Sequence, residues 1–262
     1  MGYNVFRVKK KKGWRVVMDP SPELRLMLDI IKVELDKIPL HDAAHGFVVG
    51  RSCVTNARPH RQKQMVLNLD IKDFFSSIHL EQIRGCVDIE LEGCDDWLSY
   101  WLPVCFCGNK LATGAATSPV LSNIYLKELD YTLAQVAKDL NLSYTRYADD
   151  MTFSGDIVDK GRSLIDFVQA HLKKFGLILN RKKIKLMPYY QKQVVTGILV
   201  NNEKLSLPRK YKERIFAEVR GKTFESLTPQ LAGSVEYIRS VDPSFYMKLL
   251  KEIEKNGEAR LY

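Results

Sequence analysis

The sequence has no long hydrophobic run, few cysteines and no cysteine pair in CxxC spacing. No apolar stretch approaches the roughly 18 residues that a membrane-spanning helix needs. The N-terminal stretch MGYNVFRVKKKKGW also lacks the apolar centre of a signal peptide. These absences argue against a membrane-spanning helix and predict a protein with no membrane partner.

The cysteines leave two alternatives open. Their number is odd, and the CxxC spacing that is typical of zinc sites does not occur. A zinc site built from the last four is one alternative. Reduced, buried thiols in a cytoplasmic protein are the other, and this is the alternative that we favour. The cysteines are Cys53, Cys86, Cys94, Cys105 and Cys107.

The positive charge is concentrated in one segment of the chain. The whole sequence has 40 Lys and Arg against 31 Asp and Glu, a net charge of +9. The segment 181–222 has twelve basic residues and three acidic ones, and this surplus of nine accounts for the whole imbalance. Such a concentration favours a polyanionic partner and therefore predicts nucleic acid.

Helical and strand patterns are mixed along the chain. Ser21, Pro22 and the helical spacing of apolar residues predict a helix over 21–38. The apolar run at 64–71 predicts a buried strand, and LSYTRYADDMTFSG predicts two short strands joined as a hairpin. A second hairpin is expected over 193–207, with its turn near Asn201 and Asn202. Further helices are predicted over 118–140, 163–176, 208–220, about 228–241 and 244–255.

Two adjacent aspartates, Asp149 and Asp150, stand in the apolar stretch TRYADDMTFSG. Like charges repel, and partly buried carboxylates are costly unless a cation or hydrogen bonds compensate. An ordinary surface turn is one explanation, since Asp is common in turns. However, Asp70 ends the predicted strand in VLNLDIKDFFSSI, and carboxylates are ligands that Mg²⁺ prefers. We therefore favour a metal site that uses all three.

These segments resemble reverse transcriptases, and the resemblance covers the chain almost from end to end. Asp70 matches the first catalytic aspartate of that family, and YADD matches its catalytic hairpin. ATGAATSPVLSNIYLKELD resembles the loop and helix that support the incoming nucleotide. FGLILNRKKIKL resembles a Gly-Leu-x-Leu-Asn-x-x-Lys element, and VTGILVN resembles the hairpin that grips the primer.

The resemblance implies an α+β fold of the right-hand polymerase type. Fingers, palm and primer-grip hairpin would occupy 1–207, and a short helical thumb would occupy 208–262. One departure is Ala112-Thr113-Gly114, which stands where the family usually has Pro-Gln-Gly. A glutamine contact to the nucleotide is therefore absent or replaced.

The resemblance also implies roles for individual residues. Asp70, Asp149 and Asp150 would hold two Mg²⁺ ions, for which Mn²⁺ could substitute, beside a deoxynucleoside triphosphate. Phe75 stands at the steric gate that excludes a ribose 2′-hydroxyl, with core packing as its alternative. The other predicted nucleotide contacts are Gly114, Arg51, Lys63, Asp73 and Lys183. A simple turn for Gly114, a cap for Asp73 and solvated cations for Arg51 and Lys63 are the alternatives.

Two shorter motifs resemble the retron branch of the family. Asn56-Ala57-Arg58-Pro59-His60 matches an NAxxH motif, and Val195-Thr196-Gly197 matches a VTG motif. Catalysis by Asn56 or His60 is disfavoured because no carboxylate partner or nucleophile is evident nearby in the sequence, which leaves a structural or RNA-contact role. The predicted nucleic-acid contacts are Asn56, His60, Thr196, Gly197, Arg209, Lys210 and Lys212.

A retron enzyme implies particular partners. It would copy a cognate structured non-coding RNA, which serves as template and primer, into DNA in the cytoplasm. A separate effector protein and a role in defence against phage are further implications. Group II intron-like and other bacterial reverse transcriptases are alternatives, as is a non-catalytic RNA-binding scaffold with the same fold. An RNA-synthesising polymerase is disfavoured by Phe75.

Overall fold

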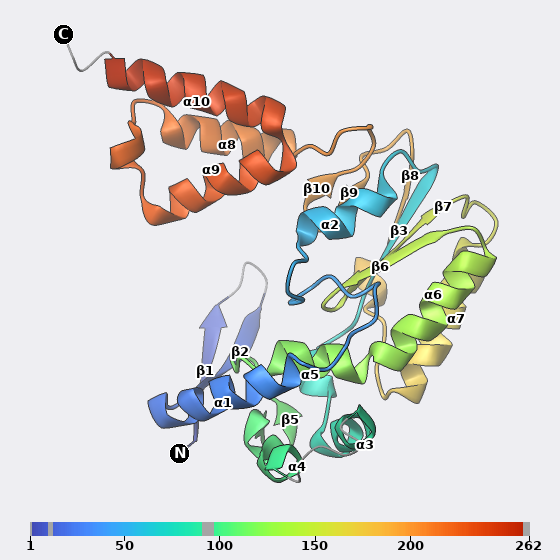
Figure 1. The fold of residues 1–262 in the computed structure, drawn as a ribbon. Coiled ribbons are helices and arrows are strands. Elements are labelled where there is room, and N and C mark those ends of the chain that lie inside the picture. Colours follow the sequence, from blue (N-terminus) through green and yellow to red (C-terminus); the bar gives the residue numbers. More distant parts are fainter. Residues whose placement is uncertain (1, 10–12, 91–96, 259–262) are drawn as a thin grey trace.

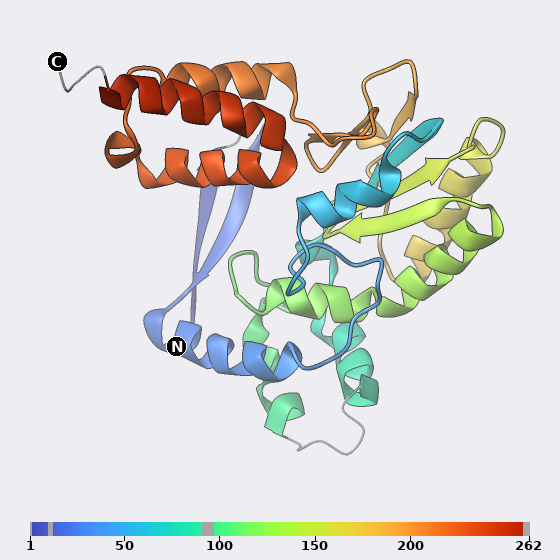
Figure 2. The same ribbon diagram turned by 45° about the horizontal axis from the view of Figure 1, so that its top comes forward.

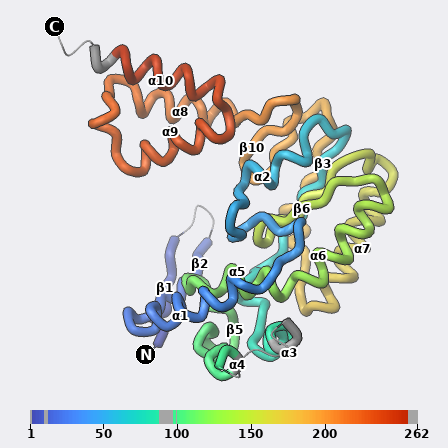
Figure 3. The backbone as a smooth tube through the Cα atoms, in the orientation of Figure 1, coloured from blue at the N-terminus to red at the C-terminus, as the bar shows by residue number. Residues whose placement is uncertain are grey.

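The fold is that of a computed structural model, and residues 2–9, 13–90 and 97–258 are described. Cys94 lies outside these ranges. A hairpin of β1 (Tyr3–Lys9) and β2 (Trp14–Pro20) leads into α1 (Pro22–Leu35), as Figures 1 and 3 show. Ser21 caps α1 by accepting a hydrogen bond from the Leu24 backbone, and Pro22 opens its first turn. The predicted helix start is therefore confirmed.

A four-stranded antiparallel sheet carries the predicted aspartates. Its strand order is β6 (Ser143–Tyr147), β7 (Asp150–Gly155), β3 (Met65–Asp70) and β8 (Lys185–Pro188). Side chains alternate between the two faces of a strand. In β3, Leu67 and Leu69 enter the main hydrophobic core, whereas Val66 enters a second one. Asp70 is therefore expected on the Val66 face.

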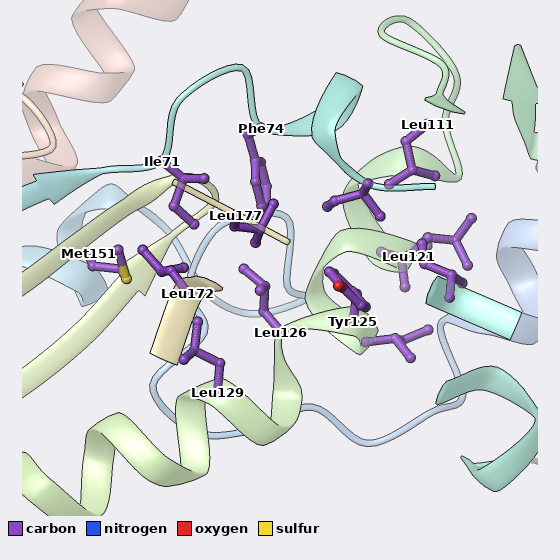
Figure 4. Close-up of a cluster of buried hydrophobic side chains, with 14 of the residues drawn as sticks. Ile71, Phe74, Leu111, Leu121, Tyr125, Leu126, Leu129, Met151, Leu172 and Leu177 are labelled. Atoms are coloured by element: carbon purple, nitrogen blue, oxygen red, sulfur yellow. The ribbon is translucent and has the colours of Figure 1, made fainter. Parts of the chain in front are cut away.

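Helices α5 (Ser118–Tyr125), α6 (Lys127–Asp139) and α7 (Gly161–Lys174) border the main core. A single helix was predicted over 118–140, but the helix breaks at Leu126, where φ is −90° and ψ is 3°. The prediction was wrong at this residue because the two halves pack differently. The first half contacts α1 and α3, and the second contacts β6. Figure 4 shows Leu126 inside this core.

The chain on either side of β3, from α1 to α5, is built from shorter elements. They are α2 (Cys53–Ala57), α3 (Leu80–Glu90), α4 (Trp97–Trp101), β4 (Phe106–Cys107), β5 (Lys110–Leu111) and the 3₁₀ turns Arg58–His60, Phe75–Ser77 and Leu102–Cys105. Another 3₁₀ turn, Arg181–Lys183, precedes β8. None of the helices in the described ranges is long and apolar enough to cross a membrane.

A second hairpin follows the sheet, formed by β9 (Val194–Val195) and β10 (Ile198–Leu199). Its turn is Thr196–Gly197, which the prediction lacked. The predicted turn near Asn201 and Asn202 lies instead in the next reversal, between Leu199 and Ser206. The chain reverses again after β10, where Leu199 and Ser206 exchange backbone hydrogen bonds. Both reversals occur within the fifteen residues 193–207, and the apolar pattern of this segment does not distinguish two turns from one.

The C-terminal bundle consists of α8 (Arg209–Val219), the 3₁₀ turn Phe224–Ser226, α9 (Pro229–Val241) and α10 (Pro243–Glu258). Figure 2 shows the bundle beside the β9–β10 hairpin and above the β1–β2 hairpin. The second core runs from Val54 of α2 through Val195 and Ile198 to Ile215 and Val235 of the bundle. The bundle is thus joined to the hairpin and to α2 by continuous packing.

Candidate active site

Strand register brings the aspartates together. Asp70, the last residue of β3, lies opposite Asp150, the first residue of β7. Ala148 and Asp149 form the turn between β6 and β7, and Ala148 has a φ of +56°. The Ile71 amide donates to the Asp149 carbonyl at 3.0 Å, which ties this turn to the end of β3. The predicted hairpin with aspartates at its turn is confirmed.

The carboxylates disfavour one another's ionisation. Burial, Asp149 and Asp70, in that order, raise the pKa of Asp150 to about 6. Burial also raises the pKa of Asp149, and the charge of Asp70 adds to this effect. A buried carboxylate next to another one binds its proton more tightly, so the site favours a compensating cation.

Asp70 is 5% exposed, and its two carboxylate oxygens have different hydrogen-bonding environments. Oδ2 accepts a hydrogen bond from Lys183 Nζ at 2.6 Å, and this bond raises the pKa of Lys183. Oδ1 is buried and has no hydrogen-bond partner among the described residues. A buried oxygen without a donor is a position at which a cation can bind.

The residues present fit Mg²⁺ better than they fit zinc. Within residues 2–9, 13–90 and 97–258, no group of three or more His, Cys, Asp or Glu side chains could hold a metal by itself. Mg²⁺ is usually bound by one or two carboxylates together with water and substrate phosphates, so a complete protein cage is not required. The described cysteines offer no zinc site, and burial raises the pKa of Cys105 to about 12.

Two cavities meet at the aspartates. The larger, of about 570 Å³, is lined by Asp70 and Asp149 together with Asp73, Phe75 and Arg15. The smaller, of about 320 Å³, is lined by the same two aspartates and also by Asp150, Thr196 and Gly197. Lys183 lines both. The carboxylates of Asp70 and Asp149 are therefore part of the wall of both cavities.

Four of the predicted nucleotide contacts lie at or near the larger cavity. Asp73, Phe75 and Lys183 line it. Gly114 follows Thr113, which also lines it, and has a φ of +127°. A Cβ atom at Gly114 would lie 2.8 Å from the Met18 carbonyl oxygen, which is too close for a side chain. The backbone of Gly114 can therefore approach β2 only because this residue is a glycine. Gly114 therefore allows the β1–β2 hairpin to pack beside this cavity.

Arg51 and Lys63 were predicted to contact the nucleotide, but the structure places both elsewhere. Arg51 donates to the Asp42 carboxylate at 2.7 Å and also to the Ala44 carbonyl at 3.2 Å. Lys63 precedes β3 and is therefore near the end of the strand opposite to Asp70. Neither residue lines either cavity.

Arg15 and Lys110 are the cations that sequence reasoning missed. Both line the larger cavity, and the charge of Arg15 lowers the pKa of Asp149. Arg15 belongs to the basic stretch RVKKKKGWR at the N-terminus, which was the available signal. Its position depends on the packing of β2 against Thr113, whose carbonyl accepts a hydrogen bond from the Met18 amide at 2.8 Å.

Asn56 and His60, for which a structural role or a contact with nucleic acid was predicted, are both 0% exposed, which favours the structural role. His60 Nδ1 lies 2.7 Å from Ser154 Oγ, and Nε2 lies 2.8 Å from Thr145 Oγ1. Burial, followed by the charges of Lys63 and His45, lowers the pKa of His60 to about 3. His60 is thus a neutral residue that joins β6 to β7 inside the protein.

We expect His60 to make folding stability depend on pH. Its pKa is lower in the folded chain than the ordinary value, so only the unfolded chain binds the proton between these values. Its contribution is complete above about pH 6.5 and decreases by up to about 1.4 kcal/mol per pH unit below that, towards the folded pKa. Urea unfolding at pH 4.5–7.5 should show this loss in the native protein relative to His60→Gln. Parallel pH profiles for the two proteins would contradict the prediction.

The predicted thumb cations have different environments. Arg209 Nε donates to Glu213 at 2.6 Å. Lys212 Nζ lies 2.5 Å from Asp242 and 5.3 Å from the centre of the Phe245 ring. Lys210 is exposed. Their contacts with nucleic acid stay a prediction, with Lys212 already engaged by an acidic side chain.

A buried ion pair supports the aspartate hairpin from the other face of the sheet. Arg146 of β6 and Asp130 of α6 are both 0% exposed, and Arg146 Nε donates to Asp130 Oδ1 at 2.9 Å. Arg146 Nη1 also donates to the Ala148 carbonyl, next to Asp149, at 3.1 Å. Sequence reasoning missed this pair because no local motif marks it.

Comparison with known proteins identifies the family. The sequence profile described as reverse transcriptase (RNA-dependent DNA polymerase) matches residues 8–211. The chain belongs to the reverse transcriptase family. This membership confirms the resemblance stated from the motifs and makes the protein's enzymatic class that of an RNA-directed DNA polymerase.

Similar reverse transcriptases include retron enzymes. The retron Mx65 reverse transcriptase of Myxococcus xanthus is 32% identical over 285 residues, which cover 97% of this chain and 65% of the relative. The retron Ec86 reverse transcriptase of Escherichia coli is 32% identical over 263 residues, which cover 97% of this chain and 81% of the relative. The predicted likeness to retron enzymes is confirmed.

Solved structures confirm the fold of this reverse transcriptase. Telomerase from Candida albicans, solved with a fragment of telomeric RNA, has a TM-score of 0.60 at 10% sequence identity. The match covers 95% of this chain and 56% of the telomerase chain. A match at this identity shows a shared fold, which is the right-hand polymerase fold that was predicted.

Proposed function

We propose that the protein is a retron-type reverse transcriptase that copies a structured non-coding RNA into DNA in the cytoplasm. The observation that carries the proposal is the position of Asp70 and Asp149, which line both cavities. An enzyme that joins a nucleotide to a primer needs two adjoining sites with the reactive groups between them. The arrangement fits this requirement.

Asp70, Asp149 and Asp150 would hold Mg²⁺, with Mn²⁺ as a substitute. When bound, the metal ions would neutralise charge on the transferring phosphoryl group and favour ionisation of the primer hydroxyl. The free Oδ1 of Asp70 and the raised pKa values of Asp149 and Asp150 support this assignment. Lys183 would stabilise the departing pyrophosphate, since its protonated Nζ lines both cavities.

The larger cavity would receive the deoxynucleoside triphosphate. Arg15 and Lys110 supply positive charge for the phosphates, in the role first assigned to Arg51 and Lys63. Phe75 supplies an aromatic wall, and its ring centroid lies 5.2 Å from that of Phe74. A rigid ring in this position would collide with a ribose 2′-hydroxyl, so the cavity would select deoxynucleotides.

Phe75→Ala is expected to weaken this selection. The ratio of kcat/KM for ribonucleotides to kcat/KM for deoxynucleotides should rise by about 10- to 100-fold, because removing the ring opens space for the hydroxyl. Single-nucleotide incorporation with each substrate gives the ratio. Ser76→Ala is the matched control, since Ser76 lines the same cavity beside Phe75. An unchanged ratio in Phe75→Ala would assign the ring to packing against Phe74.

The smaller cavity and the basic segment 181–222 would bind the primer and template. Thr196, Gly197 and Lys185 line this cavity, and the segment holds the surplus of nine positive charges. The likeness to retron reverse transcriptases is the reason for proposing a cognate structured RNA as template and primer. A separate effector protein and a role in antiphage defence are part of the same proposal.

The proposal is tested by expressing the protein together with the RNA encoded beside its gene. Purified protein should carry that RNA, and addition of deoxynucleotides with Mg²⁺ should extend it into DNA. A debranching enzyme should shift the mobility of the product if synthesis starts from an internal 2′-hydroxyl of the RNA. Extension only from an added free 3′ end would support another bacterial reverse transcriptase. RNA binding without any synthesis would support a scaffold.

A further inference from the structure

The turn between β9 and β10 has an unusual backbone conformation. Its residues, Thr196 and Gly197, have φ values of +45° and +84°. Positive φ is ordinary for glycine but rare for a β-branched residue, so Thr196 depends on surrounding contacts to hold this conformation. The turn lines the smaller cavity beside Asp70 and Asp149. Its conformation therefore decides the shape of the cavity next to the carboxylates.

The contacts that hold Thr196 come from α2. Thr196 Oγ1 donates to the Cys53 carbonyl at 3.2 Å and accepts from Asn56 Nδ2 at 3.5 Å. The hydroxyl thus acts once as donor and once as acceptor, which is the most natural use of its hydrogen-bonding groups. Asn56 is 0% exposed, so it reaches the cavity only through Thr196.

Asn56 also connects the turn to the sheet. The backbone carbonyl of Asn56 accepts a hydrogen bond from Thr145 Oγ1 at 3.4 Å. The same Thr145 oxygen lies 2.8 Å from His60 Nε2, and His60 Nδ1 lies 2.7 Å from Ser154 Oγ. Thr145 and Ser154 belong to the two strands that carry the aspartate hairpin. A continuous path of polar contacts therefore runs from these strands to the Thr196–Gly197 turn.

We propose that Asn56 is a positioning residue that holds the Thr196–Gly197 turn in register with the aspartate hairpin, and so fixes the primer end beside the carboxylates. The inference rests on the proposed function in one respect, which is that the smaller cavity receives the primer. It explains why two motifs that lie 140 positions apart meet in the fold. Neither Asn56 nor His60 touches substrate.

Asn56→Ala should raise KM for an RNA template annealed to a DNA primer by about two- to tenfold, the range for one lost neutral hydrogen bond. KM for the deoxynucleotide should stay unchanged, because Phe75 and Arg15 line the other cavity. A general loss of packing would instead change the KM for the duplex and the KM for the deoxynucleotide together. The dissociation constant of the same duplex without nucleotide, measured by fluorescence anisotropy, should rise with the primer KM.

A double-mutant cycle with Thr196→Gly decides the mechanism. Glycine adopts positive φ without support, so Asn56→Ala should have little further effect in the Thr196→Gly protein. Gln193→Ala is the control: Gln193 is a buried amide of the same segment that donates to the Lys63 and Met187 carbonyls. Its effect should be equal with and without Thr196→Gly.

An effect of Asn56→Ala that is equally large in the Thr196→Gly protein would overturn the inference. Should Asn56→Ala fail to fold, Thr196→Val removes the same hydroxyl contacts while keeping the side-chain shape, and an unchanged primer KM would also overturn it. Duplex binding by the native protein without nucleotide incorporation would refute the proposed polymerase function. The anisotropy cycle would still decide the role of Asn56 in that case.

Discussion

Asp149→Ala is expected to abolish DNA synthesis while leaving the protein folded. The substitution removes one of the two aspartates that line both cavities. Loss of a carboxylate that binds a catalytic metal removes several kcal/mol of transition-state stabilisation, so incorporation should fall by at least about a thousandfold. Stability should not fall, because burial and Asp70 already disfavour the ionised Asp149 carboxylate.

Two measurements check this result. Primer extension on an RNA template gives the activity, and urea unfolding gives the free energy of unfolding. Asp159→Ala is the matched control, since Asp159 is an exposed carboxylate that lines neither cavity. Activity near the native level in folded Asp149→Ala would refute the proposed mechanism and leave the family assignment intact.

Asp130→Ala is expected to cost about 3–5 kcal/mol of folding free energy, because it leaves the buried Arg146 guanidinium without its counter-charge. Tyr144 loses a partner as well, since its hydroxyl donates to Asp130 Oδ1 at 2.8 Å. A loss of this size is a large part of the stability of a typical domain. Urea denaturation should show it as a lower midpoint.

Two further variants separate charge from packing. Asp139→Ala, at the exposed end of the same helix, should change stability by no more than about 0.5 kcal/mol. Replacing both members of the buried pair, as in Asp130→Leu with Arg146→Met, should recover most of the loss because no unpaired charge remains. A double variant as unstable as Asp130→Ala would show that the shape of the site matters more than its charge.

The aspartate hairpin could be predicted because its signals are local. Alternating apolar residues on both sides of Asp149 and Asp150 define the strands, and the short segment between them leaves room only for a tight turn. The start of α1 was equally accessible, since Ser21 and Pro22 are adjacent to it. Family motifs added the partnership of Asp70 with this hairpin, which lies too far along the chain for any local pattern.

Cations and buried polar residues could not be placed in this way. Nothing in the sequence distinguishes Arg15 from Arg51 as a cation near the nucleotide. Only the packing of β2 on Thr113 decides that Arg15 lines the larger cavity. His60 is the last residue of the 3₁₀ turn Arg58–His60, and its side chain is buried because the turn packs against the sheet. The break at Leu126 is similar, because the apolar spacing continues through it and tertiary packing alone interrupts the helix.

The long separation of the site residues has a consequence for synthesis of the protein on the ribosome. Lys183 reaches Asp70 across 113 positions, so at about 5–20 residues per second their translation is separated by roughly 6–23 seconds. During that interval β3 has left the ribosome before either of its neighbours, β7 and β8, is complete. An unpaired apolar strand of this kind is prone to aggregation. We therefore expect β3 to stay unpaired on the growing chain until β7 has been made.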